Sequence, residues 1–211
     1  RMGGPDDSAN PRLRTAIDKA LGSNMSKDVI ARAVKRGAGG DESGNLTEVR
    51  YEGYGPNGVA VMVECLTDNK NRTVAEVRHA FTKCGGNLGT DGSVAYLFNK
   101  VGLISFPPGS DEEKIMEVAL EAGAEDIMNN DDHSLDVLTN TDDLVTIKQA
   151  LVNAGLTPEG AEVTMLASTE VSLDEEQAVK MIKLSDMLED LDDVQNVYSN
   201  ADIAEEILDK I

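Results

Sequence analysis

The 211 residues of the chain exceed the commonest size of a single domain, and 40% of them are hydrophobic, so two or three small domains with real cores are expected. The longest apolar run, VAVMV at residues 59–63, is far shorter than the roughly 20 residues of a transmembrane helix, so we expect no membrane contact. A formal net charge of −20 argues against a polyanionic partner only if the acidic residues are evenly spread.

Two short helices are predicted at the start of the chain. Asn10 is interpreted as the N-cap of an amphipathic helix over residues 11–21, which Gly22 ends. Ser26 begins a second helix, which stops at Gly37. The apolar residues expected to face inward on the second helix are Val29, Ile30, Ala33 and Val34.

A β-hairpin is predicted after the glycine-rich segment AGGDESGN at residues 38–45, which is interpreted as a domain boundary. The first strand of the hairpin covers residues 46–51, and its turn lies in GYGPNG at residues 53–58. The second strand, residues 58–66, is apolar at nearly every position. We therefore expect this strand to lie in the centre of a sheet.

The helix predicted over residues 73–84 has two different faces. Positions spaced 4, 3 and 4 residues apart lie on one face of a helix, and here they carry a row that is mostly basic. The row consists of Arg72, Glu76, His79 and Lys83. The opposite face carries Val74, Val77 and Phe81, which we expect to pack on the sheet. The basic side chains either pair with phosphates or form an ordinary solvated surface.

The stretch GGNLGTDG at residues 85–92 directly follows this helix. Gly85 and Gly86 suit the left-handed end of a helix. Gly86 and Gly89 begin two overlapping GxxG runs, which we interpret as a turn that exposes backbone N–H groups to phosphate. The stretch lacks the Lys and Ser or Thr of a Walker A loop, and an ordinary flexible connection is the alternative. A strand over residues 93–98 is predicted next.

The second half of the chain predicts a regular alternation of elements. These are a strand over 102–106, a helix over 111–122, strands over 126–128 and 135–139, a helix over 141–153 and a strand over 162–166. This β-α-β-β-α-β order is that of a ferredoxin-like unit. Apolar patterning lapses near residues 100–102 and 168–172, where we expect flexible connections. A long helix over 174–191 and a strand over 194–199 complete the predicted regular structure.

Patterns of catalytic and metal-binding residues are absent from the sequence. His79 and Cys84 lie five residues apart on one helix, which points them about 140° apart. No His, Cys and Asp residues have zinc spacing, and no G-x-S-x-G motif occurs. We therefore expect no enzyme, cofactor, metal or small-molecule substrate. Cys65 and Cys84 lack CxxC spacing, and no charged-then-apolar leader opens the chain, which together favour a cytoplasmic protein.

Positive and negative charges are segregated along the chain. Residues 1–100 hold 14 Lys and Arg against 12 Asp and Glu, whereas residues 101–211 hold 5 against 27, a net charge of −22. Residues 1–40 hold 8 basic against 4 acidic residues. A polyanion should therefore approach the first half. The acidic half is interpreted as a solvated surface.

Three stretches of the sequence carry a family resemblance. They are NPRLRTAIDKAL at residues 10–21, RYEGYGPNGVAVMVECLTDNKNRTVAEVRHAFTKCGGNLGTDGSVAYLF at residues 50–98, and ALEAGAED at residues 119–126. Together they resemble the YebC family, which includes the mitochondrial translational activator of cytochrome c oxidase. The resemblance implies a helical domain, a central α+β domain and a ferredoxin-like domain inserted into the central one. It also implies nucleic-acid binding without catalytic residues or a cofactor.

The expected fold class is therefore α+β, in three domains. Residues 1–44 form the helical domain, residues 45–100 and 172–211 the central domain, and residues 101–171 the inserted one. The residues expected to contact nucleic acid are Arg12, Arg14, Arg32, Lys35, Arg36, Arg72, His79, Lys83, Gly86 and Gly89. The expected function is that of a DNA-binding transcriptional regulator. A translation factor that contacts ribosomal RNA is the alternative, and an acidic adaptor with a protein partner is a third possibility.

Overall fold

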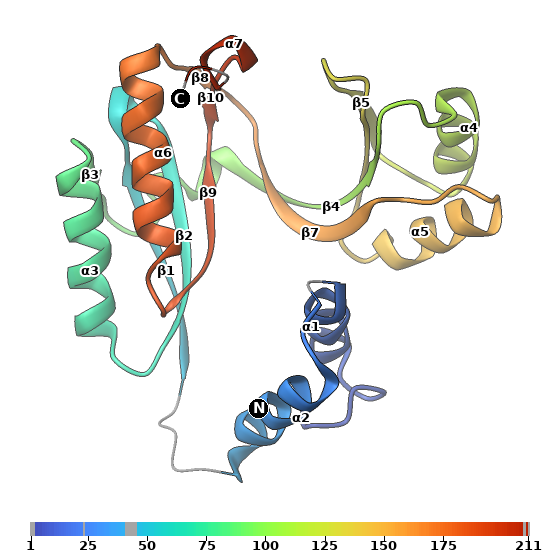
Figure 1. Ribbon diagram of the computed structural model, residues 1–211, viewed down its shortest axis with the longest axis horizontal. Coiled ribbons are helices and arrows are strands. Elements are labelled where there is room, and N and C mark those ends of the chain that lie inside the picture. Colours follow the sequence, from blue (N-terminus) through green and yellow to red (C-terminus); the bar gives the residue numbers. More distant parts are fainter. Residues whose placement is uncertain (1–2, 23, 41–45, 209, 211) are drawn as a thin grey trace. The chain divides into compact units, whose positions relative to one another are not determined.

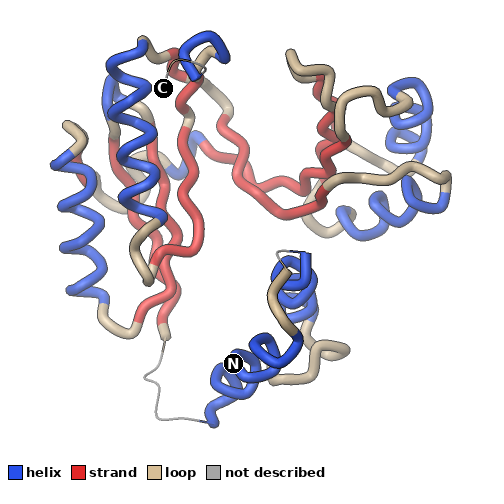
Figure 2. Tube along the Cα trace, in the orientation of Figure 1, coloured by secondary structure: helices blue, strands red, loops and turns tan. Residues whose placement is uncertain are grey.

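The computed structural model describes residues 3–22, 24–40, 46–208 and 210. The contacts within it divide the chain into two compact units, Arg1–Thr47 and Glu48–Ile211. The fold mixes helices and strands, as predicted, with seven α-helices in the described residues (Figure 1). Figure 2 distinguishes the helical first unit from the part of the chain that carries the sheets.

The first unit contains two α-helices and a π-helical turn, which are α1 (Pro11–Gly22), α2 (Lys27–Lys35) and η1 (Arg36–Gly40). Asn10 caps α1 as predicted, because its Oδ1 accepts a hydrogen bond from the N–H of Leu13 at 3.2 Å. The predicted stop at Gly37 is wrong. Arg36 has the dihedral angles of an α-helix, so the backbone does not leave the helical conformation at this residue and η1 directly follows α2.

Little of the apolar surface of the first unit is buried. Ile30 is buried and Val34 is half-buried, but Val29 and Ala33, also expected to face inward, are exposed. Helices of 12 and 9 residues present more apolar surface than they can cover on each other. Residues 41–45 of the predicted boundary segment lie outside the described residues, and the division between the units follows shortly after them.

The first sheet of the second unit has the strand order β3-β1-β2-β9. Its strands are β1 (Thr47–Tyr54), β2 (Ala60–Thr67), β3 (Asn87–Leu88) and β9 (Val194–Ser199). The predicted hairpin is confirmed, and so is the central place of its second strand, β2. The tight connection between β1 and β2 has positive φ angles of 56° at Asn57 and 76° at Gly58, which explains the residue types found there.

β9 comes from a distant part of the chain, and buried side chains hold it to β2 at both ends. Just before β9, the Asp193 carboxylate accepts hydrogen bonds from Thr67 Oγ1 at 3.0 Å and Thr73 Oγ1 at 2.7 Å. Just after β9, Asn200 Oδ1 accepts one from the N–H of Ala60 at 2.7 Å. Asp193 and Asn200 are 9% and 4% exposed, so these bonds are shielded from water.

Two helices, α3 (Lys70–Lys83) and α6 (Glu175–Glu189), cover one face of the first sheet (Figure 1). The buried residues between sheet and helices include Val61, Val63, Val77, Phe81, Ala178, Met181, Leu184 and Leu188. α3 begins three residues earlier than predicted. The reason is a side-chain cap, because Asn69 Oδ1 accepts a hydrogen bond from the N–H of Arg72 at 3.1 Å.

A second sheet has the strand order β5-β6-β4-β7, with antiparallel pairs. Its elements are β4 (Phe98–Phe106), α4 (Glu112–Glu121), β5 (Asp126–Asn129), β6 (Leu135–Thr139), α5 (Leu144–Asn153) and β7 (Gly160–Ala167). The predicted β-α-β-β-α-β order is confirmed. The core between this sheet and its helices includes Ile104, Phe106, Ile115, Val137, Ile147 and Leu151.

β4 is longer than predicted and pairs with β7 from Phe98 to Ser105. Residues 100–102, expected to form a flexible connection, therefore lie within a strand, and that prediction is wrong. Asn99 and Lys100 are exposed, so they interrupt the apolar pattern without interrupting the hydrogen-bonded ladder.

Three short elements near the C-terminus were not predicted, namely β8 (Val171–Ser172), β10 (Ala201–Asp202) and α7 (Glu205–Leu208). β8 lies within the connection expected at residues 168–172 and pairs with β10 in parallel. Regular structure therefore continues beyond Ser199. The division into three domains stays a prediction, because the contacts separate only Arg1–Thr47 from the rest of the chain.

A buried carboxylate determines the shape of residues 93–98, for which the predicted strand is wrong. Glu52 is 3% exposed. Its carboxylate accepts hydrogen bonds from the N–H groups of Gly92 at 2.9 Å, Val94 at 2.7 Å and Ala95 at 2.8 Å. These groups are thereby removed from any β ladder, and a 3-10 turn forms before β4. Burial raises the pKa of Glu52, but the three N–H donors outweigh it and hold the pKa below its ordinary value.

We expect residues 46–211 to fold without the first unit. The three buried clusters of the described structure all lie outside residues 1–47. The fragment should therefore unfold cooperatively, with a Tm within about 3 °C of that of the whole chain. Circular dichroism during heating checks this, and the absence of a cooperative transition in the fragment would contradict the division into units.

Replacing Glu52 by Gln should lower the free energy of unfolding by about 1–3 kcal/mol, because an amide cannot accept all three N–H bonds. Since the pKa of Glu52 is lowered in the folded state, its contribution is complete above the ordinary carboxyl pKa of about 4.3 and is lost as pH falls through the folded value. Urea unfolding at pH 7 and pH 3.5 measures both effects. The exposed Glu76→Gln is the control, and an equal loss at both pH values would contradict the assignment.

Candidate nucleic-acid interface

The predicted row on α3 faces away from the sheet. Arg72, Glu76, His79 and Lys83 are all exposed. The buried positions of the helix are Thr73, Val77, Ala80 and Phe81. Arg78 is also exposed, and the sequence analysis missed it because it lies outside the 4-3-4 spacing. No periodic signal marks it, because it lies four residues after Val74 and three before Phe81, on the side of the helix expected to be apolar.

Arg72 is held by two carboxylates of the protein itself. Its Nη2 lies 2.8 Å from Oδ2 and 3.0 Å from Oδ1 of Asp193, and 3.0 Å from Oδ1 of Asp68. Hydrogen bonds to Asp193 and then to Asp68 raise the pKa of Arg72. Burial raises the pKa of Asp193, but hydrogen bonds from Thr73, Arg72 and Thr67 outweigh it and lower the pKa. Arg72 therefore connects the start of α3 to the end of β2 and to the start of β9.

Gly86 and Gly89 donate their backbone N–H groups inside the protein. The N–H of Gly86 bonds to the carbonyl of Phe81 at 2.8 Å, and the N–H of Gly89 bonds to the carbonyl of Glu52 at 2.8 Å. A side chain at Gly86 would collide with the backbone oxygen of Tyr54, which explains the glycine. Neither N–H group is open to a phosphate, contrary to the predicted role.

The glycine-rich stretch does bind an anion, but this anion is the Glu52 carboxylate. The N–H groups of Gly92, Val94 and Ala95 surround this carboxylate, as in a backbone nest. A phosphate has no place where a buried carboxylate is already held. Gly86 and Gly89, the glycines of the predicted turn, donate no hydrogen bond to this carboxylate, and of its three donors only Gly92 lies in the glycine-rich stretch.

The first unit presents its own group of exposed cations. These are Arg12, Arg14, Arg32, Lys35 and Arg36. Two of them also bond to nearby backbone carbonyls: Arg14 Nη2 lies 2.7 Å from the oxygen of Ser8, and Arg32 Nε lies 3.3 Å from that of Asp28. The cations of the first unit and those of α3 belong to different units, and each group is a candidate by itself.

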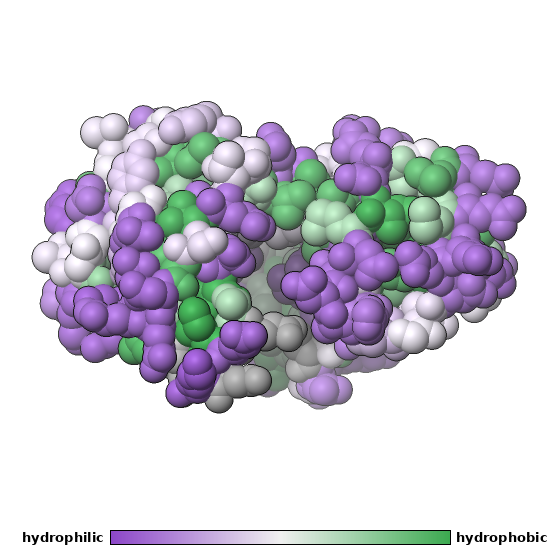
Figure 3. Space-filling view, turned by 90° about the horizontal axis from the view of Figure 1, so that it is seen from above, coloured by the Kyte–Doolittle hydropathy of each residue, from purple (hydrophilic) through white to green (hydrophobic). Residues whose placement is uncertain are grey.

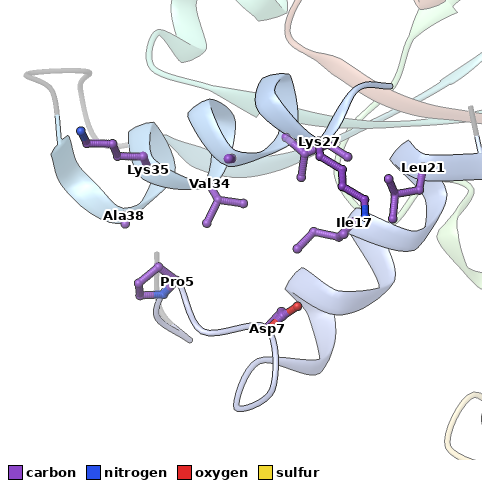
Figure 4. Close-up of a pocket in the computed structure, with 10 residues that line it drawn as sticks. Pro5, Asp7, Ile17, Leu21, Lys27, Val34, Lys35 and Ala38 are labelled. Atoms are coloured by element: carbon purple, nitrogen blue, oxygen red, sulfur yellow. The ribbon is translucent and has the colours of Figure 1, made fainter. Parts of the chain in front are cut away.

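A groove of about 580 Å³ lies within the first unit. Ile17 of α1 and Val34 of α2 both line it (Figure 4). Leu21 and Ile30 extend this apolar lining, with Lys35 beside it. The groove follows from the incomplete burial of these two helices, and Lys27 also lines it.

No helix among the described residues is long and apolar enough to cross a membrane. The same residues contain no three His, Cys, Asp or Glu side chains placed to hold a metal ion. On the face drawn in Figure 3, hydrophilic residues surround smaller groups of apolar ones.

Comparison with known proteins identifies relatives over nearly the whole chain. The family described as "TACO1/YebC protein N-terminal domain" matches residues 1–40, and "TACO1/YebC second and third domain" matches residues 46–201. A probable transcriptional regulatory protein of Coxiella burnetii (strain Dugway 5J108-111) is 67% identical over 208 residues, which are 99% of this chain and 85% of the relative. One from Francisella tularensis subsp. tularensis (strain FSC 198) is 63% identical over 211 residues, 100% of this chain and 85% of the relative.

A solved structure agrees with these sequence matches. The crystal structure of a conserved hypothetical protein from Aquifex aeolicus, Aq1575, matches with a TM-score of 0.85 and 48% identity, and covers 98% of this chain and 86% of that one. The fold, the relatives and the two family matches lead to one conclusion. The chain belongs to the TACO1/YebC family.

Proposed function

We propose that this protein is a nucleic-acid-binding regulator of gene expression that works through contacts with the phosphate backbone and without catalysis. The observation that carries the proposal is the exposure of basic side chains of α3, with Lys83 on the face predicted from the sequence and Arg78 on another side of the helix. It occurs in a chain whose residues 101–211 have a net charge of −22. Lys and Arg that neutralise phosphates release counterions, a gain that requires no groups that read a base sequence.

DNA is the first candidate partner, since the relatives from Coxiella burnetii and Francisella tularensis are named probable transcriptional regulatory proteins. The cations of the first unit are a second part of the proposed interface. Arg72, Gly86 and Gly89 are left out of it, because Nη2 of Arg72 and the backbone N–H groups of the two glycines are already bonded within the protein. Such a regulator acts in the cytoplasm of a bacterium.

Ribosomal RNA is the second candidate partner, because RNA offers the same phosphates. The two partners differ in the slope of log Kobs against log salt concentration, about −0.9 per phosphate contact on duplex DNA and about −0.7 on single strands. The exposed ring of Tyr96, described below, favours a ligand with unpaired bases.

Replacing Arg78 and Lys83 together by Gln should weaken binding to all sequences alike and reduce the salt slope by about one to two. Both positions are exposed and Gln keeps the helix propensity, so the urea midpoint should stay unchanged. Fluorescence anisotropy at several salt concentrations measures the slope. Lys114→Gln with Lys148→Gln, exposed in the acidic half, is the control and should change nothing.

Arg72→Gln should have the opposite effects. Asp193 loses its cationic partner, so the urea midpoint should fall, whereas the salt slope should stay at the wild-type value. A reduced slope in Arg72→Gln, together with a wild-type slope in the Arg78 and Lys83 double variant, would contradict the proposal. Arg72 would then make the phosphate contact, and Arg78 and Lys83 would make none.

A further inference from the structure

One aromatic side chain of the protein is left in solvent. The chain has four Tyr, three Phe and no Trp. Phe81, Phe98 and Phe106 are buried, and the other three tyrosines are half-buried. Tyr96 is 72% exposed. It lies in η3 (Ala95–Leu97), the turn that connects the glycine-rich stretch to β4.

The backbone on both sides of Tyr96 is anchored in the protein. Val94 is fully buried and Phe98 is 7% exposed, and both pack against Ala60 and Met62 on the face of the first sheet opposite to the helices. The carbonyl of Leu97, the residue after Tyr96, accepts hydrogen bonds from Ser168 N–H at 2.8 Å and Ser168 Oγ at 2.9 Å. A rigid turn with buried neighbours thus points this ring outward.

The first sheet supplies a second set of anchors. The Glu52 carboxylate holds the N–H groups of Val94 and Ala95, directly before the ring. The Tyr54 hydroxyl donates to the carbonyl of Ser93 at 2.9 Å. Contacts from β1, from β2 and from Ser168 therefore fix the turn that carries this exposed ring. An aromatic group fixed in this way loses little freedom when a planar ligand binds to it.

We propose that Tyr96 is a stacking platform for an unpaired base, so that the nucleic acid bound by this protein contains single-stranded RNA or DNA. The inference rests on the proposed function. Aromatic side chains bind unpaired bases face to face whatever the base, whereas the bases of a duplex are already stacked on each other. Lys100, exposed in the following strand, supplies a cation for the adjoining phosphates.

The test measures binding of the full chain to three labelled probes by fluorescence anisotropy. The probes are an unstructured RNA of about 12 nucleotides, the DNA of the same sequence and the corresponding DNA duplex. Tyr96→Ala and Tyr96→Leu should weaken binding to single strands by about 10- to 100-fold, and Tyr96→Phe should stay within about twofold of wild type. Duplex binding should be unchanged. Comparing the RNA with the single-stranded DNA distinguishes the two sources of unpaired bases.

Val145→Ala is the matched control, because Val145 is 75% exposed and lies in the acidic half. Equal losses on duplex and single strands would overturn the stacking role. So would wild-type binding by Tyr96→Ala while the Arg78 and Lys83 variant still loses affinity, and in that case the proposed function stands. If the wild-type chain binds none of the probes, both proposals fail. A loss in Tyr96→Ala confined to binding of another protein would assign the ring to a protein contact instead.

Discussion

The first sheet depends on a strand that the chain reaches only after it has formed a second sheet. β9 is joined to β2 by side-chain bonds that span 126 residues at Asp193 and 140 residues at Asn200. The register of these strands shifts at an irregularity opposite Glu64 and Cys65. Buried polar clamps at both ends fix it, because a slipped strand would leave each of these groups buried without a partner.

Buried polar partners also occupy two groups that the sequence suggested for phosphate binding. Arg72, the first residue of the basic row on α3, bonds to Asp193. The Glu52 carboxylate is held by the N–H groups of Gly92 and the residues that follow it. In both cases a carboxylate of the protein itself is the partner, Asp193 for Arg72 and Glu52 for the N–H groups. Other exposed cations lie further along α3 and in the first unit.

Local patterns predicted most of the fold because local physics determines it. The cap at Asn10, the apolar strand β2 and the helical spacing of Ala178, Met181, Leu184 and Leu188 all act within a few residues, and each is found in the structure. The errors arose where distant residues decide the outcome. No local signal in SVAYLF reveals that Glu52 removes its donors, and none in VGLISF reveals that β7 continues its ladder across Lys100.

The candidate site was harder to predict than the fold for the same reason. Exposure of Lys83 follows from helical periodicity, but whether a cation is available depends on acidic groups brought near it by the tertiary structure. The interrupted first sheet also sets an order of events during synthesis. β4–β7 are consecutive and can close as soon as they leave the ribosome, whereas β2 and the apolar face of α3 wait for α6 and β9. The nascent chain must therefore carry an open edge and an uncovered core until α6 and β9 are made.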